Sequence, residues 1–310
     1  MIEVSGVSKS YAGIRAVDDV SFSVSQGEIV GFLGPNGAGK TTTMKMITGA
    51  IPADRGAIKV SGFDVFEQPM EVKRRTGYLP ENPPVYNDMT VVSYLSFVAA
   101  IKGMSGARLR DGVDSSMSRC NVAGVAERLI GNLSKGFKQR VGIAQAILGN
   151  PEVLILDEPT IGLDPNQIQE VRSLIKELAR ERTVILSTHI LPEVEMTCQR
   201  VMVIHRGRIV ATDTMENIVK SRTGGESVLV RVRRDAEAAI KKAREALPVT
   251  IERHDGAADS FVAAFGKGED RREDLARLMV EGGFGLIEMR SLSLSLEEVF
   301  RQLTTDEKAQ

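Results

Sequence analysis

Residues 34–41 read Gly34-Pro35-Asn36-Gly37-Ala38-Gly39-Lys40-Thr41. This stretch fills the phosphate-binding pattern GxxxxGK[ST] at every fixed position. Its glycines let successive backbone N–H groups converge on phosphate oxygens without interference from Cβ atoms. In such a loop the lysine amine, here that of Lys40, reaches the β- and γ-phosphates, and the hydroxyl of Thr41 ligates Mg²⁺. The stretch therefore predicts a site for a nucleoside triphosphate and Mg²⁺, with Thr42 as the next nucleotide contact.

The flanking residues fit this prediction. Residues 28–33 form a short apolar run suited to a buried strand, and residues 42–47 continue as a helix. The positive end of that helix's dipole favours an anion at the loop. A glycine-rich turn that arose by chance is the alternative. The required order of strand, loop and helix argues against it.

The composition limits the classes of protein that the chain can belong to. Its 310 residues have room for one large domain and a small one, and its 40 basic and 41 acidic residues nearly cancel. No overall charge therefore favours nucleic acid or an anionic membrane. The two cysteines, Cys120 and Cys198, match no metal-binding or redox spacing. The first five residues lack the basic start and apolar core that are typical of a signal peptide, and the longest apolar stretches are far short of the roughly 18 residues that suggest a membrane span. We expect a cytoplasmic chain that reaches the membrane only through a partner.

Short β-rich segments alternate with helical ones along the first part of the chain. This order predicts an α/β fold with a doubly wound parallel sheet. A helix-prone stretch at about residues 88–130 interrupts the alternation and is expected to be a helical insertion. A charged helix is expected at residues 165–181. The predicted strands are residues 2–4, 20–24, 28–33, 56–60, 153–156 and 183–187.

A second change of composition, at residues 221–226, predicts a linker between a domain at 1–220 and a C-terminal domain at 221–310. The C-terminal domain has the order βαββαβ, which matches a ferredoxin-like unit. A final amphipathic helix is expected at residues 296–303. The predicted elements before it are strand 227–233, helix 235–246, strands 248–253 and 259–265, helix 270–282 and strand 284–290.

Two carboxylates follow the apolar strand at residues 153–156. The carboxyl ends of parallel strands meet at one edge of the sheet, so Asp157 and Glu158 should emerge beside the triphosphate. Asp157 would hold Mg²⁺, and Glu158 would polarise the attacking water. Capping of the following segment is the alternative role for these acids.

Three further residues have both a functional and a structural interpretation. His189 follows the strand at residues 183–187 and could hydrogen-bond the γ-phosphate, or could simply be structural. Ser134 precedes an apolar helix, so it is an N-cap at a helix end that can also bind an anion. Gly136 lies in the first turn, where glycine costs helix stability. Close approach of the backbone to a phosphate would explain it.

Together these stretches resemble the ATP-binding subunit of an ABC transporter. The resemblance covers residues 1–220 and rests on the loop at 34–41, Leu133-Ser134-Lys135-Gly136-Phe137, Leu156-Asp157-Glu158-Pro159-Thr160, Gly162-Leu163-Asp164 and His189. It implies that two copies enclose two ATP molecules. Each ATP would lie between the phosphate loop of one copy and Ser134 and Gly136 of the other. Asp164 would then bridge the two sites, or else be only a turn acid before Pro165. Tyr11 would stack on adenine, or else be an ordinary aromatic.

Two positions depart from the family pattern. Lys135 and Phe137 replace the third and fifth residues of the usual Leu-Ser-Gly-Gly-Gln. Glu81 replaces the glutamine that usually follows Gly-Tyr-Leu-Pro, and its carboxylate can still ligate Mg²⁺. With residues 293–300, these features resemble the gliding-motility and multidrug-export branch, which pairs with separately encoded ABC-2 type permeases. The resemblance implies an ATPase, active as a homodimer at the inner face of the membrane, that powers export.

The main alternative is a soluble ABC ATPase that acts on ribosomes or DNA. Ribosomal relatives usually carry two cassettes and a basic linker, whereas this chain has one cassette and a balanced charge. Repair-type relatives insert coiled coils or zinc-binding cysteines, which are also missing from the sequence. We therefore expect no nucleic-acid partner. A regulatory role for the tail at residues 226–310 stays open, because ferredoxin-like units serve many functions.

Overall fold

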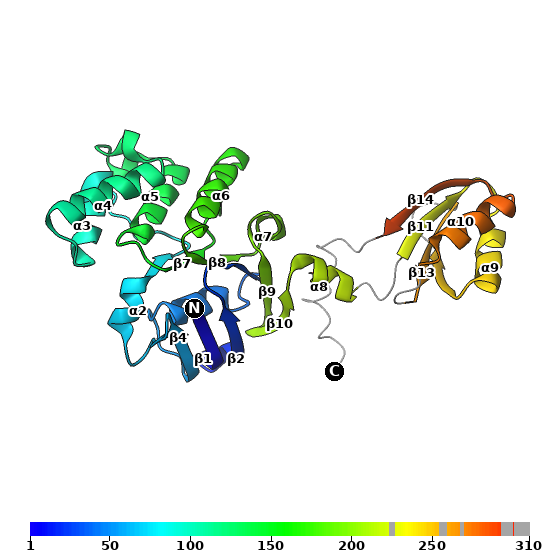
Figure 1. Ribbon diagram of the computed structural model, residues 1–310, viewed down its shortest axis with the longest axis horizontal. Coiled ribbons are helices and arrows are strands. Elements are labelled where there is room, and N and C mark those ends of the chain that lie inside the picture. The colour runs from blue at the N-terminus through cyan, green and yellow to red at the C-terminus, as the bar shows by residue number, and fades with distance from the viewer. Residues whose placement is uncertain (223–226, 254–258, 267–269, 293–299, 301–310) are drawn as a thin grey trace. The chain divides into compact units, whose positions relative to one another are not determined.

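The computed structural model describes residues 1–222, 227–253, 259–266, 270–292 and 300 (Figure 1). The chain divides into two compact units, Met1–Thr214 and Met215–Gln310. The division lies slightly before the predicted end of the first domain at residue 220. No helix in the described part of the chain is long and apolar enough to cross a membrane.

The first unit is built on a six-stranded sheet. In residues 1–214, all of which are described, its strand order is β10-β9-β3-β8-β7-β6. The strands from β9 to β6 are parallel, and β10 joins them antiparallel. The predicted α/β class is thereby confirmed. The strands are β3 (Ile29–Leu33), β6 (Thr76–Leu79), β7 (Val153–Asp157), β8 (Thr183–Thr188), β9 (Arg200–His205) and β10 (Arg208–Asp213).

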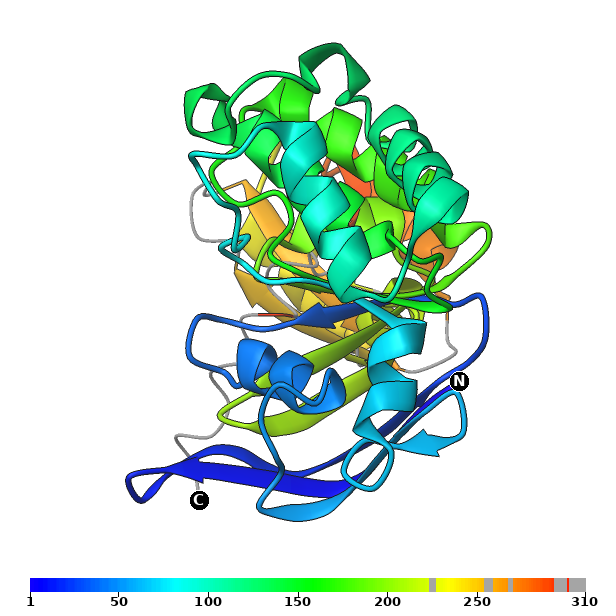
Figure 2. The same cartoon turned by 90° about the vertical axis from the view of Figure 1, so that its left-hand side faces the viewer.

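Helices cover one face of this sheet (Figures 1 and 2). Successive side chains of a strand point to opposite faces, so Leu154 and Leu156 of β7 pack toward the helices while Val153 and Ile155 pack toward the other side. Both faces are apolar, and the strands therefore read as continuous apolar runs. The helices on this side are α5 (Lys135–Ile147), α6 (Pro165–Ala179) and the short α7 (Leu191–Thr197), and α3 (Val91–Ile101) and α4 (Gly106–Arg119) pack against α5. The predicted insertion at 88–130 corresponds to α3, α4 and two 3₁₀ turns at Ala123–Val125 and Ile130–Asn132.

The opposite face meets helix α1 and a second, antiparallel sheet with the order β2-β1-β4-β5. Sequence reasoning predicted parts of three of these strands but not that they form a sheet of their own. It also missed the short helices α2 (Pro69–Arg75), α7 (Leu191–Thr197) and α8 (Met215–Arg222). The elements of this layer are α1 (Lys40–Ile47), β1 (Ile2–Tyr11), β2 (Ile14–Val24), β4 (Arg55–Val60) and β5 (Phe63–Asp64).

The described part of the second unit begins with α8 and continues in the order β11, α9, β12, β13, α10 and β14. Its sheet is antiparallel with the strand order β12-β13-β11-β14, and the helices α9 and α10 pack on one face of it through Ala239, Ala243, Leu275 and Met279. Helix α8 extends to Arg222, so the first two residues of the predicted linker are helical. Residues 223–226 and, apart from Phe300, the expected helix at 296–303 lie outside the described residues. The elements are β11 (Ser227–Val232), α9 (Ala236–Ala246), β12 (Val249–Arg253), β13 (Ser260–Phe265), α10 (Arg272–Glu281) and β14 (Leu286–Leu292).

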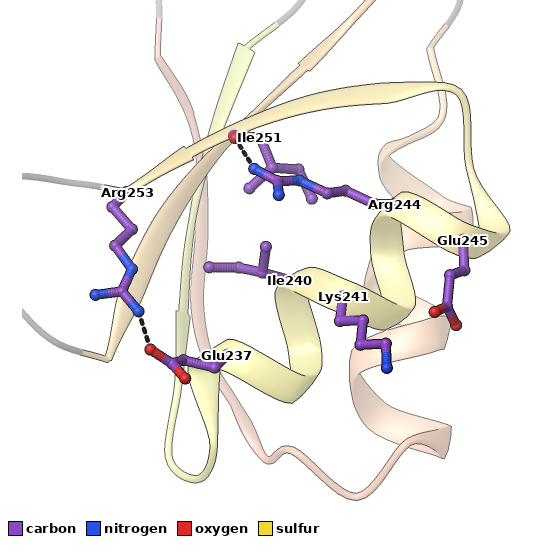
Figure 3. Close-up of a pocket in the computed structure, with 7 residues that line it drawn as sticks. All are labelled: Glu237, Ile240, Lys241, Arg244, Glu245, Ile251 and Arg253. Carbon is purple, nitrogen blue, oxygen red and sulfur yellow. Dashed lines mark hydrogen bonds and ion pairs between the residues drawn. The ribbon is translucent and has the colours of Figure 1, made fainter.

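A pocket of about 420 Å³ lies between α9 and the edge strand β12 (Figure 3). Arg244 donates a hydrogen bond of 2.6 Å to the carbonyl oxygen of Ile251, and Arg253 pairs with Glu237 (Figure 3). Exposed strand edges promote association with other strands unless side chains cover them. Arg244 therefore binds a carbonyl oxygen of the edge strand, and both arginines at this pocket already have protein partners.

Candidate functional site

The phosphate loop joins β3 to α1, and its glycines are required by the fold as well as by any phosphate. A Cβ atom on Gly34 would lie 2.4 Å from the carbonyl oxygen of Ile204, and one on Gly39 would lie 2.5 Å from that of Ala16. Gly37 and Gly39 have φ values of +80° and +106°. These are left-handed conformations that side chains rarely adopt. The loop is therefore held closely between its neighbours before any phosphate contact is considered.

Lys40 is buried and turns back over the loop. Its Nζ atom donates hydrogen bonds of 2.8 Å and 3.2 Å to the carbonyl oxygens of Gly34 and Pro35. The same atom lies 3.3 Å from Oε1 of Glu158, and only 6% and 5% of the two side chains are exposed. Thr41 and Thr42 occupy the first turn of α1 beside it. The structure thus brings the predicted phosphate-binding amine against the predicted catalytic acid.

Glu158 also contacts His189. The Nδ1 atom of His189 lies 3.0 Å from Oε1 and 2.9 Å from Oε2 of the carboxylate. Glu158 has a φ of +50°, which is uncommon for a residue other than glycine and is typical of functional sites. Its N–H donates to the carbonyl oxygen of Ser187 at 2.9 Å, which helps to hold this conformation. The ends of β3, β7 and β8 therefore bring Lys40, Glu158 and His189 together.

Asp157 ends β7 and is completely buried. In the described part of the chain, neither of its carboxylate oxygens meets a donor at full hydrogen-bond geometry. Burial raises the pKa of this carboxyl; the Glu158 and Glu81 carboxylates add to the rise, and the Ser187 and Thr41 hydroxyls oppose it. Buried carboxylate oxygens without donors, close to a threonine hydroxyl, are suited to a hard divalent cation such as Mg²⁺.

A metal here would depend on the nucleotide as well as on the protein. Among the described residues there is no group of three or more His, Cys, Asp or Glu side chains placed to hold a metal ion. Mg²⁺ usually binds through one or two carboxylates together with substrate phosphates, so the set of Thr41, Asp157 and Glu81 fits it. Glu81 lies just beyond β6, and its charge reaches both Asp157 and Tyr78.

The two segments predicted to face a second copy lie next to one another. Ser134 is the N-cap of α5 and accepts a hydrogen bond of 3.4 Å from the N–H of Phe137. Asp164 is the N-cap of α6 and accepts from two backbone N–H groups, including that of Gln167, each at 3.0 Å. A Cβ atom on Gly136 would lie 2.7 Å from the side chain of Gln167. Gly136 therefore packs closely against the end of a side chain on α6, a neighbour that sequence reasoning did not consider.

Tyr11 lies at the end of β1, and 45% of it is exposed. The Nζ atom of Lys9 lies 5.9 Å from the centre of its ring. The ring is thus accessible for stacking, and its contact with adenine stays a prediction.

Sequence reasoning missed three buried polar residues behind the site: Thr160, Thr188 and Glu193. Glu193 accepts hydrogen bonds from both threonine hydroxyls. Its position in the sequence resembles that of an ordinary acidic residue in the first turn of a helix, where the dipole favours a carboxylate. Only its burial distinguishes it, and the sequence does not contain that signal.

Comparisons with known proteins identify the family. The family model described as "ABC transporter" matches residues 17–161. The bacitracin transport ATP-binding protein BcrA of Bacillus licheniformis is 34% identical, over 98% of this chain and 97% of its own. The daunorubicin/doxorubicin resistance ATP-binding protein DrrA of Streptomyces peucetius is also 34% identical, over 98% and 92% of the two chains.

Solved structures give the same result. A structure described as the ATP binding subunit of an ABC transporter has a TM-score of 0.65 and 33% identity, and the match covers 71% of this chain and 92% of that one. CbiO1 of Clostridium perfringens, described as part of the ABC transporter complex cbiONQ, has a TM-score of 0.64 and 26% identity over 80% and 95% of the two chains.

These findings confirm the resemblance that the five motifs predicted. The names of the two relatives, which refer to bacitracin transport and to drug resistance, match the multidrug-export branch. The chain belongs to the ABC transporter family and is one of its ATP-binding, ATP-hydrolysing proteins.

Proposed function

We propose that this protein forms a homodimer around two ATP molecules and powers a separately encoded membrane permease that exports its substrate. The observation that carries the proposal is the buried contact of Glu158 with both Lys40 and His189, beside the completely buried carboxylate of Asp157. The names of BcrA and DrrA support export. The name of CbiO1, as part of a transporter complex, supports a partner. The permease would hold the chain at the cytoplasmic face of the membrane.

In this proposal each residue of the site has one task. Glu158 accepts a hydrogen bond from the attacking water and orients it toward the γ-phosphorus. His189 holds the Glu158 carboxylate in position and can reach the γ-phosphate. Lys40 neutralises charge on the phosphates. Bound Mg²⁺ would neutralise further phosphate charge, held by Thr41 and Asp157 with Glu81 nearby.

The dimer is proposed from the second set of motifs. Helix α5 presents its N-terminus at the exposed Ser134, with Gly136 buried in the first turn behind it, and backbone N–H groups and the dipole favour an anion there. Gln167 connects Asp164 to this segment, because its N–H donates to the Asp164 carboxylate and its side chain packs next to Gly136. We infer that this surface meets the ATP held by the phosphate loop of a second copy.

The test is to isolate what accompanies the protein in the membrane. The Glu158→Gln variant, purified with ATP from membranes in mild detergent, should bring down a multi-span membrane protein in stoichiometric amount. Wild-type protein purified with ADP is the control. Recovery of ribosomes or DNA with no membrane protein would contradict the proposal.

Glu81 provides a prediction about coupling to the permease. Glu81→Gln removes one negative charge near Asp157, restores the residue usual in the family, and should leave the Kd for ATP nearly unchanged. Stimulation of ATP hydrolysis by the permease should change by about 5-fold or more, which is a typical allosteric coupling. The measurement is ATPase activity with and without the reconstituted permease. An unchanged stimulated rate would rule out this role of Glu81.

A further inference from the structure

Three polar side chains form a buried cluster behind the proposed catalytic pair. The hydroxyl of Thr160 donates a hydrogen bond to Oε1 of Glu193, and the hydroxyl of Thr188 donates one of 2.7 Å to Oε2. The exposed fractions of Thr160, Thr188 and Glu193 are 4%, 0% and 3%. Both oxygens of one buried carboxylate are therefore used, each by a different segment of the chain.

The two segments are the ones that carry the proposed catalytic pair. Thr160 lies two residues after Glu158 in the turn that follows β7, and Thr188 directly precedes His189 at the end of β8. Glu193 is in the first turn of α7, which packs next to β8 (Figure 1). The Thr188 hydroxyl also accepts a hydrogen bond of 3.1 Å from the N–H of Ile190, so it holds the backbone on both sides of His189.

Packing alone does not explain a carboxylate at the buried position of Glu193. Burial of an ionised group costs free energy unless hydrogen bonds compensate for the lost water, and an apolar side chain would pack there without that cost. The two threonine hydroxyls provide the compensation. Such a network holds its members in one arrangement because each unmade bond would leave a buried polar atom unsatisfied.

We propose that Glu193 is a positioning residue that sets the spacing between Glu158 and His189. The inference rests on the proposed roles of these two residues and extends them. The Glu158–His189 contacts of 2.9 Å and 3.0 Å join residues on two strand ends, and Glu193 joins the same two ends from behind. We call Glu193 with its two threonine partners, Thr160 and Thr188, the clamp. Small displacements of a catalytic group strongly lower the rate of reaction, so the clamp should affect turnover rather than ATP binding.

The clamp also includes the segment that leads to Asp164. The N–H of Leu163 donates a hydrogen bond of 3.2 Å to the carbonyl oxygen of Thr160. The proposed dimer places residues 162–164 against the second copy. A shift of this segment would therefore move Thr160 and, through its hydroxyl, Glu193. His189 and the dimer-facing segment are thus connected through one buried carboxylate.

The experiment compares four variants of the full chain: Glu193→Ala, Glu193→Gln, Thr188→Val and the control Glu195→Gln. Glu195 is on the same helix but exposed. Glu193→Ala and Thr188→Val should lower kcat by roughly 10- to 100-fold. The Kd for a fluorescent N-methylanthraniloyl-ATP should change by less than about twofold, because these variants leave the groups that bind ATP in the ground state unchanged. Glu193→Gln keeps an oxygen acceptor and should recover part of the lost rate, and Glu195→Gln should match wild type.

A double variant separates positioning from general damage to the fold. If Glu193 acts through His189, Glu193→Ala combined with His189→Ala should be little slower than His189→Ala alone, because coupled residues are not additive. The inference would be overturned if the fold loss of kcat in the double variant equalled the product of the losses in the two single variants. It would also be overturned if Thr188→Val and Glu193→Gln both had the kcat of wild type. These two conservative variants decide the matter if Glu193→Ala does not fold. Wild-type kcat in Glu158→Gln would instead refute the proposed function.

Discussion

Glu158→Gln is expected to bind ATP and to hydrolyse it roughly 10²- to 10⁴-fold more slowly than wild type, which is the usual contribution of a positioned general base. The amide has the shape of the carboxylate but accepts a proton poorly. Lys40, Asp157 and Thr41 are unchanged, so the groups that bind the phosphates and metal remain. The variant should also bind ATP more tightly, because it no longer places a negative charge 3.3 Å from the amine that meets the phosphates.

Single-turnover hydrolysis and the Kd for ATP measure the two halves of this prediction separately. In the proposed dimer, slow hydrolysis should also accumulate the ATP-bound dimer, which size-exclusion chromatography with and without ATP can detect. Glu195→Gln is the matched control, because it makes the same chemical change at an exposed position. Undiminished turnover in Glu158→Gln would assign the activation of water to another residue.

Part of the parallel core could be predicted, because the buried strands β3, β7 and β8 are recognisable by themselves, whereas β6 and β9 of the same sheet were missed. The predicted strands at residues 153–156 and 183–187 each end one residue before β7 and β8 end. Strands that are buried on both faces are continuous apolar runs, and this pattern is local. The positions of Glu158 and His189 follow from the same reasoning, since the carboxyl ends of neighbouring parallel strands meet at one edge.

The antiparallel sheet could not be predicted in the same way. Its β1–β2 and β4–β5 pairs are hairpins with two-residue turns, but the central pairing of β1 with β4 spans a long sequence distance, as when Ile2 pairs with Val60. The alternation of side chains identifies a strand but does not name its partner. Strand β3 and helix α1 lie between the two hairpins in the chain, so only the folded structure shows that the hairpins form one layer.

The contacts that support the site residues from behind could not be predicted from the sequence either. Gly136 was expected to allow close approach of a phosphate, and the structure adds a close neighbour that no motif contains, the end of the Gln167 side chain on another helix. Glu193 joins two threonines that are 28 residues apart, and no single motif contains all three side chains. Motifs identify residues that meet a ligand, whereas the residues behind them depend on how separate segments pack.

The buried ion pair between Lys40 and Glu158 leads to a second large effect, on stability. Lys40→Met keeps most of the side-chain volume but removes the positive charge 3.3 Å from a carboxylate that is 4% exposed. Breaking a buried pair from one side leaves the other charge without compensation, so the free energy of unfolding should fall by about 3 kcal/mol. His189 remains in contact with Glu158, which limits the loss to the lower end of the usual range. ATP binding should be lost in the same variant, because the amine that meets the phosphates is gone.

The double variant Lys40→Met with Glu158→Gln tests the electrostatic origin of this loss. It removes both charges, so the urea midpoint measured by far-UV circular dichroism without nucleotide should rise above that of Lys40→Met alone. Recovery should be incomplete, because the hydrogen bonds from Lys40 to the carbonyl oxygens of Gly34 and Pro35 remain absent. Lys45→Met, at an exposed position of the same helix, is the control. If Lys40→Met matched that control, or if the double variant were the less stable of the two, the carboxylate of Glu158 would not depend on Lys40 for its charge compensation.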